Sequence, residues 1–236
     1  MAFPQMQTKG AFGDQFVETT GRQMFHGSVM TLPDGRRFVY ASFGAATVAG
    51  SLYQSEVRTA NWFSENPTAV AAKGAIQVTM DVNTTPALDD FEDGNLVDET
   101  NFHCYTVKGN SAADPTVVDL YEKLQTDLIT ADVVSIMKSA YKDTVIKTAA
   151  RADAPAIGIA PFAQTSTHYG WLQTYGISVA LAEDVLIIGD RVVASPVSDA
   201  GAVSASITNL GLDQTVGRCL EIGTNQAACT IFLTLG

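Results

Sequence analysis

The chain has 236 residues, of which 46% are hydrophobic, so it is long and apolar enough to form one large or two small folded domains. It carries 14 basic and 25 acidic residues, and the resulting net charge of −11 disfavours nucleic acid and anionic membrane surfaces as partners. No apolar run approaches the roughly 18 residues of a membrane-spanning helix, and the N-terminus lacks the pattern of a secretory signal, so we expect a soluble protein made in the cytoplasm.

Residues 1–26 show neither the helical period nor the alternation of a strand. Their phenylalanines are spaced singly and have no periodic element that would bury them. This pattern predicts an extended arm that lies on the protein's own body or on a neighbouring subunit, with a partly ordered terminus as the alternative. The candidate contact residues of this arm are Phe3, Phe12, Phe16 and Phe25.

From Gly27 onward the sequence favours β-structure. Pro33-Asp34-Gly35 separates two alternating runs and has the residues that a hairpin turn requires. The stretch 76–82 alternates apolar and polar side chains, which predicts a half-buried strand.

Six acidic residues lie between Asp89 and Glu99. Aligned on Gly94, a helix-loop-helix calcium motif would need oxygen ligands where Phe91 and Thr100 stand, so that motif fails at two positions. We expect a solvated acidic rim around an Asp93-Gly94 turn, and a looser site of oxygen ligands for a cation remains open.

Residues 115–128 allow two interpretations. Asp114 is a suitable N-cap, Pro115 suits the first helical position, and the apolar residues that follow have helical spacing, so the local sequence favours a helix. The competing interpretation is a strand with Val118, Leu120 and Leu124 on one face.

The segment after Ala149 is rich in proline and small residues, which is typical of a linker, and short alternating runs follow it to the C-terminus. We therefore predict an arm at 1–26, a β-rich domain at 27–160 and a small β-barrel or sandwich at 161–236. The expected fold class is mainly β, with small barrel or sandwich modules and at most one or two short helices.

The stretch "HYGWLQTYGISVALAEDVLIIGD" predicts a hairpin with strands at 169–173 and 177–181 joined by a turn at 174–176. One apolar face, which includes Ile177 and Val179, would be covered. Trp171 is expected to fill a core or an interface, and His168 would point to the opposite face of the strand from Trp171.

No complete catalytic or metal-binding motif occurs in the sequence. The histidines His26, His103 and His168 are far apart, and the three cysteines lack ligand spacing and are expected to be reduced. We expect no catalytic residue, metal or cofactor, and a hydrolase site assembled from distant segments is the alternative.

Several motifs in residues 30–236 resemble those of a group of tailed-bacteriophage virion structural proteins. They are "LPDGRRFVYASFGAATVAGSLYQSE", "FEDGNLVDETNFHCYTVKGN", "VVDLYEKLQTDL" and "HYGWLQTYGISVALAEDVLIIGDRVVAS", followed by "GAV" and the terminal "IFLTLG", in this order. Proteins of this group resemble capsid decoration or cement proteins, which are β-rich oligomers bound to the outside of a shell. The counterpart of 116–126 in such relatives is a strand.

The resemblance implies a non-enzymatic protein of the virion exterior whose partners are the major capsid protein and further copies of itself, as a homotrimer rather than a dimer. The four phenylalanines of the arm would contact the capsid or a neighbouring copy. The first alternative is a tail or fibre component that recognises a host surface glycan, and the second is a virion-associated hydrolase.

Overall fold

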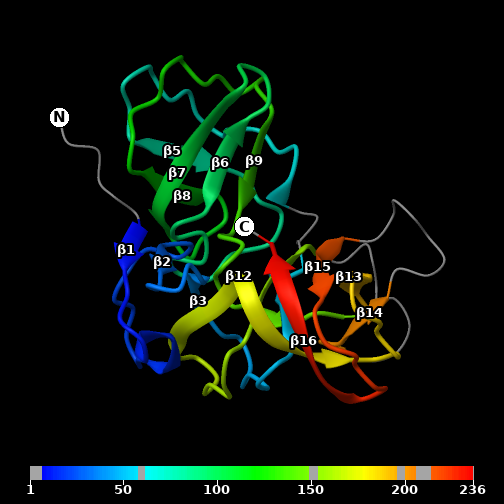
Figure 1. Ribbon diagram of the computed structural model, residues 1–236. Coiled ribbons are helices and arrows are strands. Elements are labelled where there is room, and N and C mark those ends of the chain that lie inside the picture. Colours follow the sequence, from blue (N-terminus) through cyan, green and yellow to red (C-terminus); the bar gives the residue numbers. More distant parts are fainter. Residues whose placement is uncertain (1–6, 58–61, 149–153, 196–199, 206–213, 236) are drawn as a thin grey trace. The chain divides into compact units, whose positions relative to one another are not determined.

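The computed structural model describes residues 7–57, 62–148, 154–195, 200–205 and 214–235. Strands dominate, and the helical content of these residues is limited to the 3-10 turn η1, so the expected mainly β fold class is confirmed (Figure 1). None of the helices found within those ranges is long and apolar enough to cross a membrane.

The chain packs as two compact units, residues 1–57 with 140–236 as unit 1 and residues 58–139 as unit 2. This division differs from the predicted one at 26/27 and 160/161. The reason is strand pairing over long sequence separations, because strand β12 (Tyr169–Ala182) pairs with β3 (Arg37–Ser42). Such pairing leaves no mark on the local sequence pattern.

Unit 1 is an eleven-stranded sheet that curls into a half-barrel. Its main path runs β1-β2-β3-β12-β14-β13-β15-β16, and β16 pairs again with β12, so this end of the sheet closes on itself. The remaining elements of unit 1 are β1 (Gln7–Lys9), η1 (Asp14–Phe16), β2 (Val29–Thr31), β4 (Leu52–Gln54), β10 (Val145–Ile146), β11 (Ala156–Ile159), β13 (Arg191–Ala194), β14 (Val203–Ala205), β15 (Thr215–Cys219) and β16 (Ala227–Thr234).

Unit 2 is a five-stranded barrel in the order β5-β8-β7-β6-β9. Strands β5, β6 and β8 alternate buried with less buried positions, and the inward side chains of the barrel form one apolar core with Trp62 and Phe91 in edge contact. The strands are β5 (Gln77–Met80), β6 (Asn95–Asp98), β7 (His103–Asn110), β8 (Thr116–Leu120) and β9 (Val134–Met137).

The helix that the local sequence favours at 115–128 does not form. Thr116–Leu120 is instead strand β8, which pairs with β5 on one side and β7 on the other. Leu124 and Leu128 are buried from an irregular segment, whose backbone N–H groups bond to carbonyl oxygens of the 71–75 segment. Partner strands on both sides outweigh the local helical preference.

Strand β12 is continuous across the predicted turn, so the hairpin prediction was wrong. Gly176 has φ +94° and the register shifts between Gln173 and Tyr175, which bends the strand without ending it. The first half of β12 pairs with β3 and the second half with β16 (Figure 1). The glycine and bulge therefore mark a change of partner strand rather than a reversal of the chain.

Candidate interaction surface on strand β12

The second half of β12 presents an apolar face to solvent. Ile177 and Val179 are 58% and 54% exposed, whereas Ala180 and Ala182 on the opposite face are buried. The prediction that Ile177 and Val179 belong to a covered face was therefore wrong within this chain. The alternation itself was read correctly, but the small alanines, and not the β-branched residues, face the core.

A groove of about 490 Å³ runs along this face, and we call it the β12 groove. Apolar side chains predominate in its lining, to which the arm, the 49–50 and 160–161 loops and β12 all contribute. A second hollow beside the 34–36 turn shares Arg36 and Ile177 with it, so the two form one continuous surface depression. The apolar residues that line the groove include Phe16, Ala49, Pro161, Ile177, Val179 and Leu181.

The structure brings one of the four arm phenylalanines into this groove. Phe16 lines it and packs edge-on against Phe162, with ring centroids 5.9 Å apart. Phe12 and Phe25 are exposed, and the Arg22 guanidinium lies 5.7 Å from the Phe25 ring centroid. Phe3 lies outside the described residues.

Residues 7–26 of the arm lie on the protein's own body. Strand β1 pairs in parallel with β2, and Thr19 forms a two-way backbone bridge with Tyr169 at the start of β12. Between these points the turn η1 places Phe16 beside β12. Of the two locations expected for the arm, its own body is therefore the one observed for these residues.

Glu18 fastens the arm through polar contacts. Its carboxylate accepts hydrogen bonds from the backbone N–H of Thr165 at 2.9 Å and from the Thr165 hydroxyl at 3.0 Å, and it lies 3.2 Å from His168 Nδ1. The Thr165 backbone N–H is the main cause that lowers the pKa of Glu18 below its ordinary value. His168 thus contributes to holding the arm, a role that the sequence did not reveal.

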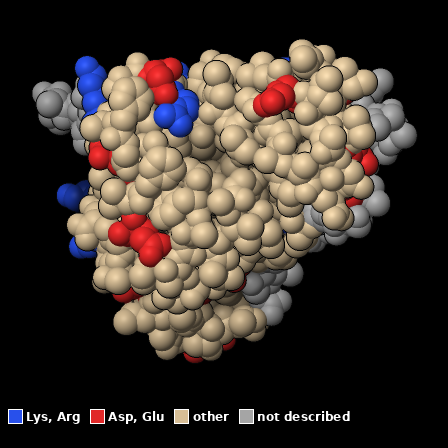
Figure 2. Space-filling model, turned by 60° about the horizontal axis from the view of Figure 1, so that its bottom comes forward, with Lys and Arg blue, Asp and Glu red and all other residues tan. Residues whose placement is uncertain are grey.

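The lining of the β12 groove includes one charged residue, Arg36. Arg36 is held by Asp34, with Nε and Oδ2 2.7 Å apart, and Arg37 lies over the Tyr175 ring at 5.0 Å. Uncharged residues also make up most of the face of the molecule seen in Figure 2, where charged side chains are few and separated. The apolar lining of the β12 groove suits association with another apolar surface.

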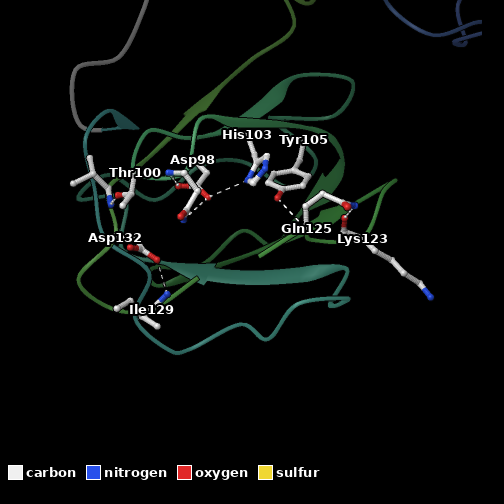
Figure 3. A network of polar contacts seen from close by, with 10 residues as sticks. Asp98, Thr100, His103, Tyr105, Lys123, Gln125, Ile129 and Asp132 are labelled. Atoms are coloured by element: carbon white, nitrogen blue, oxygen red, sulfur yellow. Dashed lines mark hydrogen bonds and ion pairs between the residues drawn. The ribbon is translucent and has the colours of Figure 1, made fainter. Parts of the chain in front are cut away.

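Unit 2 has a polar network around the turn from β6 to β7 (Figure 3). Buried Asp98 accepts hydrogen bonds from the backbone and side-chain amides of Asn101, and its Oδ2 lies 3.8 Å from His103 Nδ1. Thr100 accepts a hydrogen bond from the Val133 N–H. These contacts fix a tight turn.

Phe102, at the tip of this turn, is 92% exposed and has φ +59°. A bulky side chain rarely adopts this left-handed conformation. Nothing in the periodicity around Phe102 marks this position. The Asp-x-x-Asn pattern before it is the signal that could have indicated a capped turn.

The acidic segment 89–99 is more than a solvated rim. Its Phe91 and Leu96 are fully buried in the barrel core, and Asp90 forms an ion pair with Lys138 at 2.7 Å. Across the described ranges, no group of three or more His, Cys, Asp or Glu side chains is placed to hold a metal ion.

The three histidines lie in three separate environments. His103 neighbours Asp98, His168 neighbours Glu18, and the His26 ring lies 5.9 Å from the Tyr169 ring.

Comparison of the chain with protein-family models, with curated proteins and with solved structures found no match.

Proposed function

We propose that this protein is a non-enzymatic structural component of a phage virion, which binds the outer surface of the capsid shell as an oligomer and stabilises the head. The observation that carries the proposal is the open apolar groove on β12, into which Phe16 of the arm is built. An exposed and preformed apolar groove of this kind is a common feature of docking surfaces.

The distribution of charge supports the same proposal. Residues 58–139 hold 13 acidic and 5 basic residues, a net charge of −8, while the longer remainder holds 12 acidic and 9 basic residues, a net charge of −3. Unit 2 thus suits exposure to solvent, where its negative charge favours solubility. Unit 1, with the β12 groove, suits contact with the major capsid protein.

Recognition of a host glycan by a tail or fibre component has weaker support. Aromatic rings that stack on sugars need an exposed face, and both tryptophans, Trp62 and Trp171, are buried. The exposed rings, such as Phe12, Phe25 and Phe102, come from separate segments. We therefore retain the decoration role as the conclusion.

The test is the number of copies on purified particles of the phage that encodes this chain. Quantitative mass spectrometry and cryo-electron microscopy should give hundreds of copies spread over the shell. A few copies at a single vertex would overturn the decoration role in favour of a tail component.

Shells that lack the protein allow the groove itself to be tested. The variant Ile177→Asp with Val179→Asp should rebind shells at least tenfold more weakly than the parent chain, because it places charge in the apolar groove. The matched control is Val70→Asp with Leu88→Asp, which charges two exposed apolar residues of unit 2 and should bind like the parent.

A further inference from the structure

Two loops of unit 1 lie side by side and are joined by backbone hydrogen bonds. Residues 183–190 connect β12 to β13, and residues 220–226 connect β15 to β16. Leu186 and Gly223 exchange N–H to carbonyl bonds in both directions at 3.1 Å, and the Gly189 N–H bonds to the Cys219 carbonyl at 2.9 Å. The two loops therefore form a single surface.

This surface carries five exposed aliphatic side chains. Each is the direct sequence neighbour of a residue in the Leu186–Gly223 or Gly189–Cys219 pair. Their exposed fractions lie between 41% and 63%. Single exposed aliphatic residues are ordinary, but a group of five on two joined loops marks an interaction site. We call it the aliphatic patch: Val185, Ile187, Ile188, Leu220 and Ile222.

The aliphatic patch is held rigidly. Leu186, between two of its residues, is fully buried in the core of unit 1. The Asp190 carboxylate accepts the Ile187 N–H at 2.9 Å, and the Asp190 N–H bonds back to the Ile187 carbonyl at 3.0 Å. Little conformational entropy is lost when such a preorganised surface binds.

Charges of both signs border the patch, in a chain whose net charge is strongly negative. Arg191 and Arg218 are register partners on β13 and β15. Asp190 directly precedes Arg191, and Glu221 lies between Leu220 and Ile222 of the patch. A second copy of the same surface would offer apolar side chains to the patch, and opposite charges to its border.

The patch can form the apolar centre of an interface between copies. Its five side chains are aliphatic and 41–63% exposed, whereas a standard interface takes roughly 800 Å² from each partner. The charged and polar border supplies the remainder, as the rim of an interface usually does.

We propose that copies of this chain associate through the aliphatic patch into a closed cyclic oligomer. The inference rests on the proposed function in one respect, because that function includes an oligomer. The association itself needs no shell. A patch that contacts the same patch of another copy near a symmetry axis gives a closed assembly and not an open fibre.

The test is the mass of the purified full chain, measured by sedimentation between micromolar and hundred-micromolar concentration without shells. The parent chain should be oligomeric, and Ile188→Asp with Ile222→Asp should raise the dissociation constant at least tenfold while circular dichroism and melting temperature stay unchanged. Should that variant fold poorly, Ile188→Ser with Ile222→Ser provides the same comparison. The matched control, Ile177→Asp with Val179→Asp, should remain oligomeric.

Exchanging two charges distinguishes self-association from the binding of a different partner at the patch. Arg218→Glu and Glu221→Arg should each weaken association, and the double variant should restore it, because both charges then change sign on every copy. A monomeric parent chain, an unchanged mass for the patch variant, or dissociation of the control alone would each overturn the proposal. Since no shell is used, none of these results bears on the copy number that tests the decoration role.

Discussion

Trp171 packs edge-on against Tyr40, its register partner across strands β12 and β3, with ring centroids 5.3 Å apart. Trp171 is only 6% exposed and belongs to an apolar cluster with Met30, Leu32 and Phe38. The contact joins the N-terminal strands of unit 1 to the strand that also carries the β12 groove.

Trp171→Ala should lower the free energy of unfolding by roughly 3–5 kcal/mol, the usual cost of truncating a buried tryptophan. Ile177→Ala on the same strand is the control, and it should change stability by less than about 1 kcal/mol because its side chain already faces solvent. Urea unfolding of both variants measures the difference. Equal effects would contradict the assignment of the two faces of β12.

Glu18 should make the attachment of the arm dependent on pH. Its pKa is lowered in the folded protein, chiefly by the Thr165 N–H, so the carboxylate contacts are complete above the ordinary pKa of glutamate and are lost as the pH falls through the lowered value. The protection factor of the Thr19 amide, which bonds to the Tyr169 carbonyl, should therefore fall between pH 7 and pH 3.

Glu18→Gln is the matched variant for this measurement. It should show reduced Thr19 protection already at pH 7, with little further change on acidification. Equal protection in the parent chain at both pH values would show that the backbone bridge alone holds the arm.

The cysteines should differ in reactivity toward an aromatic disulfide reagent at pH 8. Burial raises the pKa of both Cys219 and Cys229, to about 11 for Cys229, and the thiolate is the reactive form. Cys104 is exposed. One thiol per native chain should react quickly and all three should react in denaturant. Cys104→Ser should abolish the fast reaction, and a fast phase that survives in this variant would contradict the assignment.

Phe102→Gly should stabilise the protein. Glycine adopts φ +59° without the steric cost that a Cβ atom imposes, and little apolar burial is lost, so the free energy of unfolding should rise by roughly 1 kcal/mol. Phe102→Ala keeps the Cβ atom and should show little gain. A lower urea midpoint for the glycine variant than for the alanine variant would refute the explanation by backbone strain.

Local patterns were enough to predict the class of the fold. Alternation around Val78 and Met80 and the Pro33-Asp34-Gly35 turn correspond to β5 and to the connection between β2 and β3. Pairing between distant segments was not predictable, because it depends on which strands meet. For this reason the sequence left helix and strand both open at 115–128, where strand β8 forms, and the predicted hairpin at 169–181 was wrong.

The same limit applies to the candidate surface. The alternation of Ile177 and Val179 correctly placed them on one face, but an apolar face reads alike in sequence whether it meets a core or remains open. Phe16 was singled out because no periodic element could bury it. Its position in the β12 groove, however, depends on the Thr19 bridge to Tyr169, which joins segments 150 residues apart.

The order of the two units along the chain has a consequence for synthesis. Unit 2 is inserted between residues 57 and 140 of unit 1, so all five strands of the barrel are synthesised before β12. The barrel, whose strand pairs are close in sequence, is expected to fold first, while β3 waits for β12 with one edge unpaired. Slower translation of residues 140–182 would prolong that exposure. Chaperones are therefore expected to bind nascent chains that end before residue 182, in which this strand edge is still unpaired.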